Sequence, residues 1–315
     1  MSKSFKLLIT LGDAAGIGPE VVFKSILNIK VPKNFKLYIV GEEVCFKRYK
    51  LNLKEISKKI ELIRVRVLKN KKFPIGRLNL STSKAGFLYL KEAVRLLKKG
   101  EFKGIVTAPL NKEGISRFLK IDFKGHTDFF EKEFKRKTVM LFSYKDFRVS
   151  LLTRHIPLRK VFLKLTQTNL KEHLEILVSS LKKLFKIKDP KIGVCGLNPH
   201  AGESGKFGDE ERILEDVIKN FKRKGIKITG PFSPDTIFVH WKKFDCILSL
   251  YHDQGLIPFK LLFFNKGTNI SLGLPFVRTS PIHGTAFDIA GKNKADFNSM
   301  KNSILEAIKL LKNAS

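Results

Sequence analysis

Short apolar segments alternate with glycine-containing loops and amphipathic helices along the whole chain. The segments that predict β-strands are residues 5–11, 37–40, 64–68, 104–108, 139–142, 147–152, 192–197 and 246–250. The segments that predict helices begin at Pro19, run from a cap at Ser81 or Thr82 to Lys99, and cover 170–185, 209–224 and 295–311. This alternation predicts an α/β protein with a largely parallel sheet, in which 139–142 and 147–152 form one antiparallel pair.

The chain has 315 residues, more than a single hydrophobic core usually contains, so we expect two packed lobes. Its hydrophobic fraction of 43% is ordinary for a globular protein. Its apolar runs are strand-length, far short of the ~20 residues that span a membrane. The start, M-S-K-S-F-K-L-L-I-T-L-G-D, lacks the apolar core and cleavage site of a signal peptide. We therefore expect a cytoplasmic protein with no membrane partner.

The formal net charge is +32, from 61 lysines and arginines against 29 acidic residues. Such a charge is compatible with nucleic-acid binding. The lysines, however, are spread along the chain and greatly outnumber the arginines that phosphate and base recognition favours. The phenylalanines form no RNA-binding aromatic motif. We therefore expect no nucleic-acid partner, and we expect the charge to attract small anionic substrates.

The three cysteines, Cys45, Cys195 and Cys246, are widely spaced and form no CxxC pair. Cys195 and Cys246 lie in strand-like runs, where a cysteine usually acts as a small hydrophobic residue. We expect buried, inert thiols rather than a disulfide or a zinc–thiolate site.

Residues 196–211, G-L-N-P-H-A-G-E-S-G-K-F-G-D-E-E, follow a predicted strand and place His200 among glycines and carboxylates. His155 in L-L-T-R-H-I-P-L and His252 in L-S-L-Y-H-D-Q-G also follow strand-like segments and are expected in loops. Loops after strands carry the chemistry of α/β enzymes. Three neutral imidazoles suit a divalent cation such as zinc and leave a position open for substrate. Because the spacings are long, three unrelated polar histidines remain the alternative.

Other segments carry candidate anion-binding residues. The run G-H-T-D opens a predicted helix that Thr127 can cap, with His126 at the positive end, where an anion is favoured. Lys260, Asn269 and Arg278 lie in one C-terminal region and can hold a phosphate and a carboxylate. The alternatives are a plain helix cap at Thr127 and a solvated side chain at Lys260.

Two glycine-rich segments each have two interpretations. Residues 12–20, G-D-A-A-G-I-G-P-E, form either a phosphate loop or a tight strand-to-helix turn with Pro19 in the first helical turn. They match neither G-x-G-x-x-G nor a Walker A sequence. Residues 283–291, H-G-T-A-F-D-I-A-G, form either a turn before the last helix or a loop whose aspartate accepts the ribose hydroxyls of a nucleotide.

Taken together, these segments resemble one family. The runs I-T-L-G-D-A-A-G-I-G-P-E, V-T-A-P-L-N-K-E, G-H-T-D-F, R-H-I-P-L, G-L-N-P-H-A-G-E, Y-H-D-Q-G-L-I-P-F-K and G-L-P-F-V-R-T-S-P-I-H-G-T-A-F-D-I-A-G are similar to those of the 4-hydroxythreonine-4-phosphate dehydrogenases, the PdxA enzymes of vitamin B6 biosynthesis. The resemblance covers residues 8–296 in the order of the family. Seven motifs in order are far more specific than any single one.

The resemblance assigns roles to individual positions. It implies that His155, His200 and His252 bind a divalent metal, which is zinc, magnesium or cobalt. It implies that the substrate-binding residues are His126, Thr127, Lys260, Asn269 and Arg278. It also implies a homodimer in which a histidine of the partner subunit, expected to be His252, completes each metal site. Asp253 is the candidate catalytic residue, expected to orient His252 or to transfer a proton.

The fold that the resemblance implies is two-lobed α/β/α, like that of isocitrate and isopropylmalate dehydrogenases, with a mixed sheet and NAD bound without a Rossmann domain. Residues 283–291 look like the adenosine-binding loop of those enzymes, which implies that Gly284 and Asp288 bind NAD or NADP. The expected lobes are residues 1–135 with 270–315, which carry that loop, and residues 136–269, which carry the metal ligands and the dimer interface. The active site is expected in the cleft between the lobes.

The implied reaction is the oxidation of 4-phosphohydroxy-L-threonine to 2-amino-3-oxo-4-phosphohydroxybutanoate, which loses carbon dioxide to give 3-amino-2-oxopropyl phosphate in pyridoxine 5′-phosphate biosynthesis. A related dehydrogenase of threonate or erythronate 4-phosphate would use the same phosphate and metal residues. Phosphate acyltransferases share the scaffold but do not need the three histidines. Ala14 and Arg154 depart from the family pattern without replacing an implied ligand.

Overall fold

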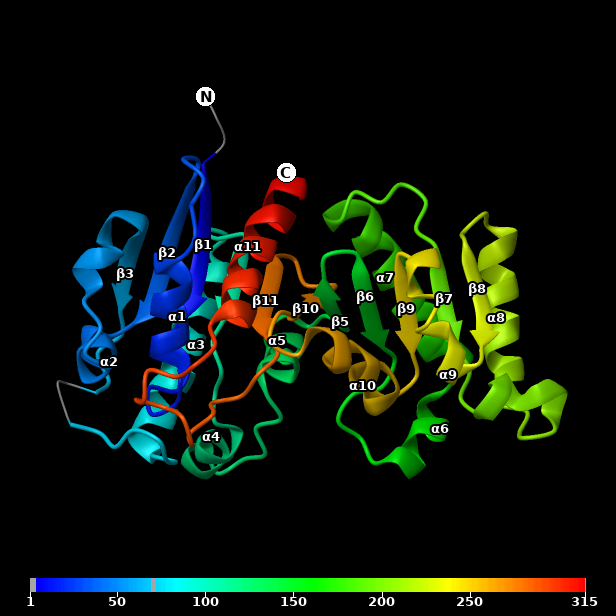
Figure 1. The fold of residues 1–315 in the computed structure, drawn as a ribbon, viewed down its shortest axis with the longest axis horizontal. Coiled ribbons are helices and arrows are strands. Elements are labelled where there is room, and N and C mark those ends of the chain that lie inside the picture. The colour runs from blue at the N-terminus through cyan, green and yellow to red at the C-terminus, as the bar shows by residue number, and fades with distance from the viewer. Residues whose placement is uncertain (1–3, 69–71, 315) are drawn as a thin grey trace. The chain divides into compact units, whose positions relative to one another are not determined.

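The structure is a computed structural model that describes residues 4–68 and 72–314 (Figure 1). The chain divides into two compact units. Unit 1 is Met1–Arg136 with Leu274–Asn313, and unit 2 is Lys137–Gly273. Each unit contains parallel strands covered by helices, and only unit 2 has antiparallel pairs among the strand pairings described below. The mixed α/β class predicted from the alternating pattern is confirmed.

Unit 1 is built on parallel strands in the order β3-β2-β1-β4-β11. The strands are β1 Phe5–Thr10, β2 Phe35–Gly41, β3 Ile60–Arg64, β4 Gly104–Thr107 and β11 Val277–Pro281. The helices are α1 Gly18–Leu27, α2 Glu43–Arg48, α3 Leu80–Lys98, α4 Lys112–Leu119, α5 His126–Phe134 and α11 Asn298–Asn313. Leu7, Leu8 and Ile9 point alternately to the two faces of β1 and are all fully buried, so helices cover both faces.

Unit 2 has a mixed arrangement in the order β10-β5-β6-β9-β7-β8. Its strands are β5 Val139–Tyr144, β6 Phe147–Leu151, β7 Ile192–Cys195, β8 Ile228–Phe232, β9 Cys246–Ser249 and β10 Thr268–Leu272. Its helices are α6 Val161–Lys164, α7 Gln167–Leu184, α8 Glu211–Arg223, α9 Pro234–Ile237 and α10 His252–Phe263. The predicted antiparallel pair β5–β6 is confirmed, and β10 adds a second antiparallel pairing to β5. The pairs β6–β9, β9–β7 and β7–β8 are parallel.

Several predicted boundaries are wrong for local reasons. The strand expected at 64–68 is Ile60–Arg64, because Ile60 pairs with Leu37 of β2 and the ladder ends at Arg64. The cap of α3 is Asn79, whose side-chain oxygen accepts a bond from the Thr82 N–H at 3.1 Å. Gly125, not Thr127, lies at the cap of α5 with φ 137°, so Thr127 is inside the first turn.

The three cysteines are free and buried, as predicted. Burial raises the pKa of each thiol to about 12. Because the thiolate is the reactive form, these side chains are inert at neutral pH. In the described part of the chain, no helix is long and apolar enough to cross a membrane.

His173 of α7 is buried against β6, where its Nε2 lies 3.3 Å from the Ser150 hydroxyl. Burial, with the charges of Lys137 and Arg154, lowers the pKa of His173 to about 3. Below pH ~6.5 the unfolded chain therefore binds a proton that the folded chain excludes, and stability is lost as the pH falls. We expect the advantage of wild type over His173→Gln in unfolding free energy to shrink by about 1 kcal/mol between about pH 7 and about pH 5.5. Urea unfolding at the two pH values measures this, and an unchanged advantage would contradict a neutral buried imidazole.

Candidate functional site

Two of the predicted metal ligands, His155 and His252, lie together in unit 2. They follow β6 and β9, which are neighbouring parallel strands, so both chain segments leave the same edge (Figure 1). Beyond the strands, Thr153 donates from its N–H and its hydroxyl to the Leu250 carbonyl, at 3.1 and 2.7 Å. The two imidazole ring centres are 5.6 Å apart. Two histidines that share one zinc ion have ring centres roughly 5–6 Å apart, so the pair fits a metal site.

Asp253 orients the imidazole ring of His252, the residue before it in the chain. Its carboxylate oxygen Oδ1 is 2.6 Å from Nδ1 of His252. Since a carboxylate accepts, Nδ1 is the donor, and in a neutral ring Nε2 then keeps the lone pair that a metal needs. His252 is the first residue of α10, so the expectation that it lies in a loop is wrong. Pro258 inside the helix obscured the helical pattern of this segment.

His200 lies in the segment Pro199–Gly205, which has an unusual backbone. Five successive residues from His200 to Ser204 have φ between 42° and 79°, in the left-handed region. Such a conformation costs a residue other than glycine roughly 1–2 kcal/mol, and it persists only where the surroundings hold it. The His200 side chain is exposed, with its ring centre 6.2 Å from that of Phe207.

The three predicted ligands do not meet within one chain. Among residues 4–68 and 72–314, no group of three His, Cys, Asp or Glu side chains could hold a metal ion. The structure therefore brings His155 and His252 together and leaves His200 outside that pair.

In unit 1, two predicted substrate-binding residues, Arg278 and His126, lie close enough for the charge of one to act on the other. Arg278 of β11 is 2% exposed, donates from Nη2 to the Thr107 hydroxyl at 2.8 Å, and lies 6.0 Å from the centre of the Phe130 ring. Burial lowers the pKa of Arg278 to about 9. Burial first, and then the charges of Arg278 and Lys112, hold the pKa of His126 well below its usual value. A bound anion would stabilise the charged forms of Arg278 and His126 and so raise both pKa values again.

The ring of His126 has capacity for a ligand. Its Nε2 is shielded from solvent and has no hydrogen-bond partner within the described chain. Buried polar atoms in proteins are nearly always hydrogen-bonded, so an unpartnered one marks a position for a ligand or water. Thr127 is 6% exposed in the same first turn of α5, where main-chain N–H groups favour an anion.

Two more predicted substrate-binding residues belong to unit 2. Asn269 of β10 has a buried Oδ1 that lacks a hydrogen-bond partner among the described residues. Lys260 lies on α10 and is half-buried. Thr107, which the sequence reasoning did not name, ends β4 inside the V-T-A-P-L-N-K-E motif and contacts Arg278. That motif was the only signal that pointed toward it.

The predicted cofactor residues Gly284 and Asp288 lie in the exposed segment between β11 and α11 of unit 1. This segment packs on the glycine-rich turn after β1, where the Ile17 N–H donates to the Thr285 carbonyl at 2.9 Å. A Cβ added to Gly16 would lie 2.7 Å from that carbonyl oxygen, so Gly16 is needed for the close approach. Around Gly284 the described atoms leave open space.

Of the two interpretations of residues 12–20, the structure favours the strand-to-helix turn over the phosphate loop. The buried Asp13 carboxylate accepts from the Ala15 N–H at 3.0 Å and from the Ser83 hydroxyl at 2.8 Å. Burial raises the pKa of Asp13. A carboxylate inside this turn opposes the binding of a phosphate there.

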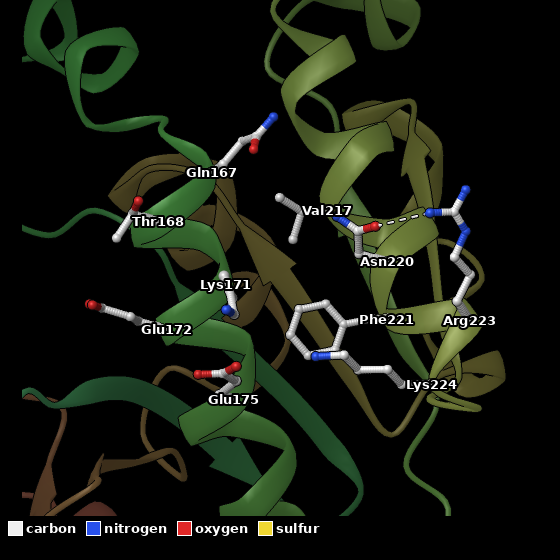
Figure 2. A pocket seen from close by; sticks show the side chains of 10 residues that line it. All are labelled: Gln167, Thr168, Lys171, Glu172, Glu175, Val217, Asn220, Phe221, Arg223 and Lys224. Carbon is white, nitrogen blue, oxygen red and sulfur yellow. Dashed lines mark hydrogen bonds between the residues drawn. The ribbon is translucent and has the colours of Figure 1, made fainter.

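A groove of about 600 Å³ between α7 and α8 is distinct from these positions (Figure 2). Its lining mixes charges of both signs with Phe221 and Val217, and Arg223 donates to Asn220 across the surface of α8. None of the predicted site residues lines it.

The fold is that of a class of α/β dehydrogenases of known structure. The solved structure of 4-hydroxythreonine-4-phosphate dehydrogenase from Klebsiella pneumoniae is similar, with a TM-score of 0.85 and 32% identity, over 98% of this chain and 99% of that one. A branched-chain phosphotransacylase from Enterococcus faecalis shares the fold at 14% identity and a TM-score of 0.59.

The sequence comparisons identify the family. The family described as "Pyridoxal phosphate biosynthetic protein PdxA" matches residues 20–307. The 4-hydroxythreonine-4-phosphate dehydrogenase of Aquifex aeolicus is 40% identical over 97% of each chain. A putative D-threonate 4-phosphate dehydrogenase of Symbiobacterium thermophilum is 34% identical over 94% of this chain and 93% of its own. The chain belongs to the PdxA family of oxidoreductases, as its motifs predicted.

Proposed function

We propose that the chain is a metal-dependent 4-hydroxythreonine-4-phosphate dehydrogenase that uses NAD or NADP. It oxidises 4-phosphohydroxy-L-threonine to 2-amino-3-oxo-4-phosphohydroxybutanoate, and this product loses carbon dioxide to give 3-amino-2-oxopropyl phosphate, a step toward pyridoxine 5′-phosphate. The observation that carries the proposal is the pair His155 and His252, with ring centres 5.6 Å apart and Nδ1 of His252 held by Asp253. A phosphate acyltransferase on the same fold has no need of such a pair.

The metal ligands are His155 and His252 of one chain and His200 of the partner subunit. This differs from the expectation that His252 comes from the partner, because His155 and His252 adjoin within one chain. These histidines would hold zinc, cobalt or magnesium, which would supply a Lewis acid for loss of the substrate's hydroxyl proton. Asp253 keeps Nε2 of His252 available, which is the positioning role of a carboxylate behind a ligating histidine.

A homodimer is supported by an apolar face on α10. Ile257, Leu261 and Phe264 are 59%, 81% and 70% exposed, and their spacing of four and three residues places them on one side of the helix. Large apolar side chains exposed together mark an interaction surface. Since α10 begins at His252, a second copy that covers this face lies close to the histidine pair. That copy can bring the His200 of the partner subunit to the metal.

Charged and polar side chains would bind the substrate's anionic groups. Arg278 supplies a buried cation, and the neutral His126 supplies Nε2 as a hydrogen-bond donor to a phosphate oxygen. Thr127 and the first N–H groups of α5 add donors, and Lys260 and Asn269 bind further polar groups of the substrate. The nucleotide is held by Gly284 and by Asp288, which accepts the ribose hydroxyls.

The proposal has a direct assay. Purified protein should form NADH or NADPH from 4-phosphohydroxy-L-threonine, lose this activity to a chelator and regain it with zinc, cobalt or magnesium. The alternative substrates, D-threonate and erythronate 4-phosphate, share the phosphate but lack the amino group. Full activity after complete removal of metal would contradict the metal-dependent mechanism.

A further inference from the structure

A buried carboxylate accepts hydrogen bonds from the start of the segment that carries His200. Glu211, the first residue of α8, is 4% exposed. Its Oε1 accepts from the N–H groups of Leu197 and Asn198 at 2.9 and 2.8 Å. Its Oε2 accepts from the Asn198 side-chain amide at 3.0 Å. These three bonds fix the chain immediately before Pro199 and His200.

The left-handed run folds closely around the same carboxylate. A Cβ added to Gly202 would lie 2.7 Å from Oε2 of Glu211, and one added to Gly196 would lie 2.8 Å from the Ala201 Cα. The backbone therefore needs glycine at Gly202 to approach Glu211 and at Gly196 to approach the left-handed run. Glu211 thus lies against Gly202 inside this run and is bonded to the two residues before Pro199.

A second buried side chain links this segment to the helix of His252. Gln254, which is 8% exposed, accepts from the Leu250 N–H at 2.7 Å and donates to the Gly196 carbonyl at 2.8 Å. It lies two residues after His252 on α10. Hydrogen bonds of Gln254 therefore connect the start of the His200 segment to the start of α10 within one chain.

We infer that Glu211 is a positioning residue for metal binding: it holds the segment 196–205 in the strained form that presents His200 as a ligand. Its buried carboxylate is occupied by three N–H bonds from Leu197 and Asn198, so it would act through the segment that carries His200. A carboxylate that accepts three N–H bonds gives the segment one arrangement, and a neutral or shortened side chain would let the left-handed run relax. The inference rests on the proposed metal site.

The test compares Glu211→Ala and Glu211→Gln with Glu215→Ala, a matched control at an exposed glutamate of the same helix. Metal affinity is measured by competition with a chelator, and the ligand set is read from the visible absorption spectrum of the cobalt-substituted protein. We expect Glu211→Ala to weaken metal binding about 10- to 100-fold, as loss of a residue behind a ligand does. Its cobalt spectrum should change in the same sense as that of His200→Ala. Glu211→Gln should be intermediate, because it keeps one acceptor oxygen but turns a donor toward the Asn198 amide, and the control should match wild type.

The outcomes separate this inference from the proposed function. If wild type itself binds no divalent metal, the proposed function fails. If wild type binds metal and a folded Glu211→Ala binds it with the same affinity and spectrum, only the positioning role of Glu211 fails. If both Glu211 variants fail to fold, the residue serves general stability and the inference is overturned. Hydrogen exchange in residues 196–205 of the folded variants should rise relative to the control.

Discussion

Heterodimers of a His155→Ala subunit and a His200→Ala subunit are expected to keep about half of the wild-type activity. In such a dimer, one site combines the intact His155 and His252 of one subunit with the intact His200 of the other. The second metal site of this dimer lacks both His155 and His200. Homodimers of either variant have no intact site, and their activity should fall ~10²–10⁴-fold, since the Lewis acid contributes several kcal/mol.

The matched control is a heterodimer of His155→Ala with His252→Ala. Because the rings of these two residues adjoin in one chain, every site of this heterodimer lacks one ligand and should be inactive. Co-expression with two affinity tags isolates each heterodimer, and NADH formation with metal content measures the sites. Recovery in the control pair alone would show that His252 is the shared ligand. Absence of recovery in both would show that the metal is not shared between subunits.

Replacing Arg278 by methionine is expected to lower kcat/KM for a phosphorylated substrate by ~30- to several-thousandfold. Removing one partner of a buried, hydrogen-bonded charge pair costs about 2–5 kcal/mol, and here the partner is the substrate phosphate. Without ligand, however, the guanidinium is a charge that burial disfavours, as the lowering of its pKa to about 9 shows. Methionine keeps the apolar packing on Phe130 but loses the bond to the Thr107 hydroxyl, so the loss in kcat/KM should be larger than the loss in stability of the unliganded variant.

Arg148 provides the matched control for this change. It is also buried, at 6% exposure, but its guanidinium donates to the main-chain carbonyls of Lys145, Asp146 and Asp245. Arg148→Met leaves these acceptors unsatisfied and should lower the melting temperature while KM for the folded enzyme stays unchanged. Thermal melts and steady-state kinetics of both variants measure the contrast. A large stability loss in Arg278→Met with an unchanged KM would show that Arg278 is structural.

The alternation of apolar runs and helices was enough to predict the fold class, because central strands of the parallel ladders, such as β4, β7 and β9, are buried on both faces and read as apolar runs. The pair β5–β6 was visible for the same reason, with Lys145 at φ 51° in the turn between the strands. β3 was placed too late, because its exposed Glu61 and Arg64 blur the apolar pattern of an edge strand. α10 was missed as a helix because it follows a strand at once and contains Pro258.

The sequence named candidate site residues but not their arrangement. His155 and His252 are distant in sequence, and only the pairing of β6 with β9 brings their rings together. The left-handed backbone at His200 depends on Glu211, and no local pattern distinguishes that buried carboxylate from Glu210 beside it. The unpartnered Nε2 of His126 likewise depends on how α5 packs near Arg278. Residue types revealed the chemistry, whereas the contacts that tune it are tertiary.

The central claim is that the chain is a 4-hydroxythreonine-4-phosphate dehydrogenase. The most direct measurement is kcat/KM of the metal-loaded wild type with 4-phosphohydroxy-L-threonine and with D-threonate 4-phosphate, from NADH formation under identical conditions. D-threonate 4-phosphate carries a hydroxyl in place of the amino group, and a near-isosteric exchange of this kind is discriminated ~10²-fold. We therefore expect 4-phosphohydroxy-L-threonine to be preferred by at least that factor. Equal rates, or a preference for D-threonate 4-phosphate, would contradict the claim.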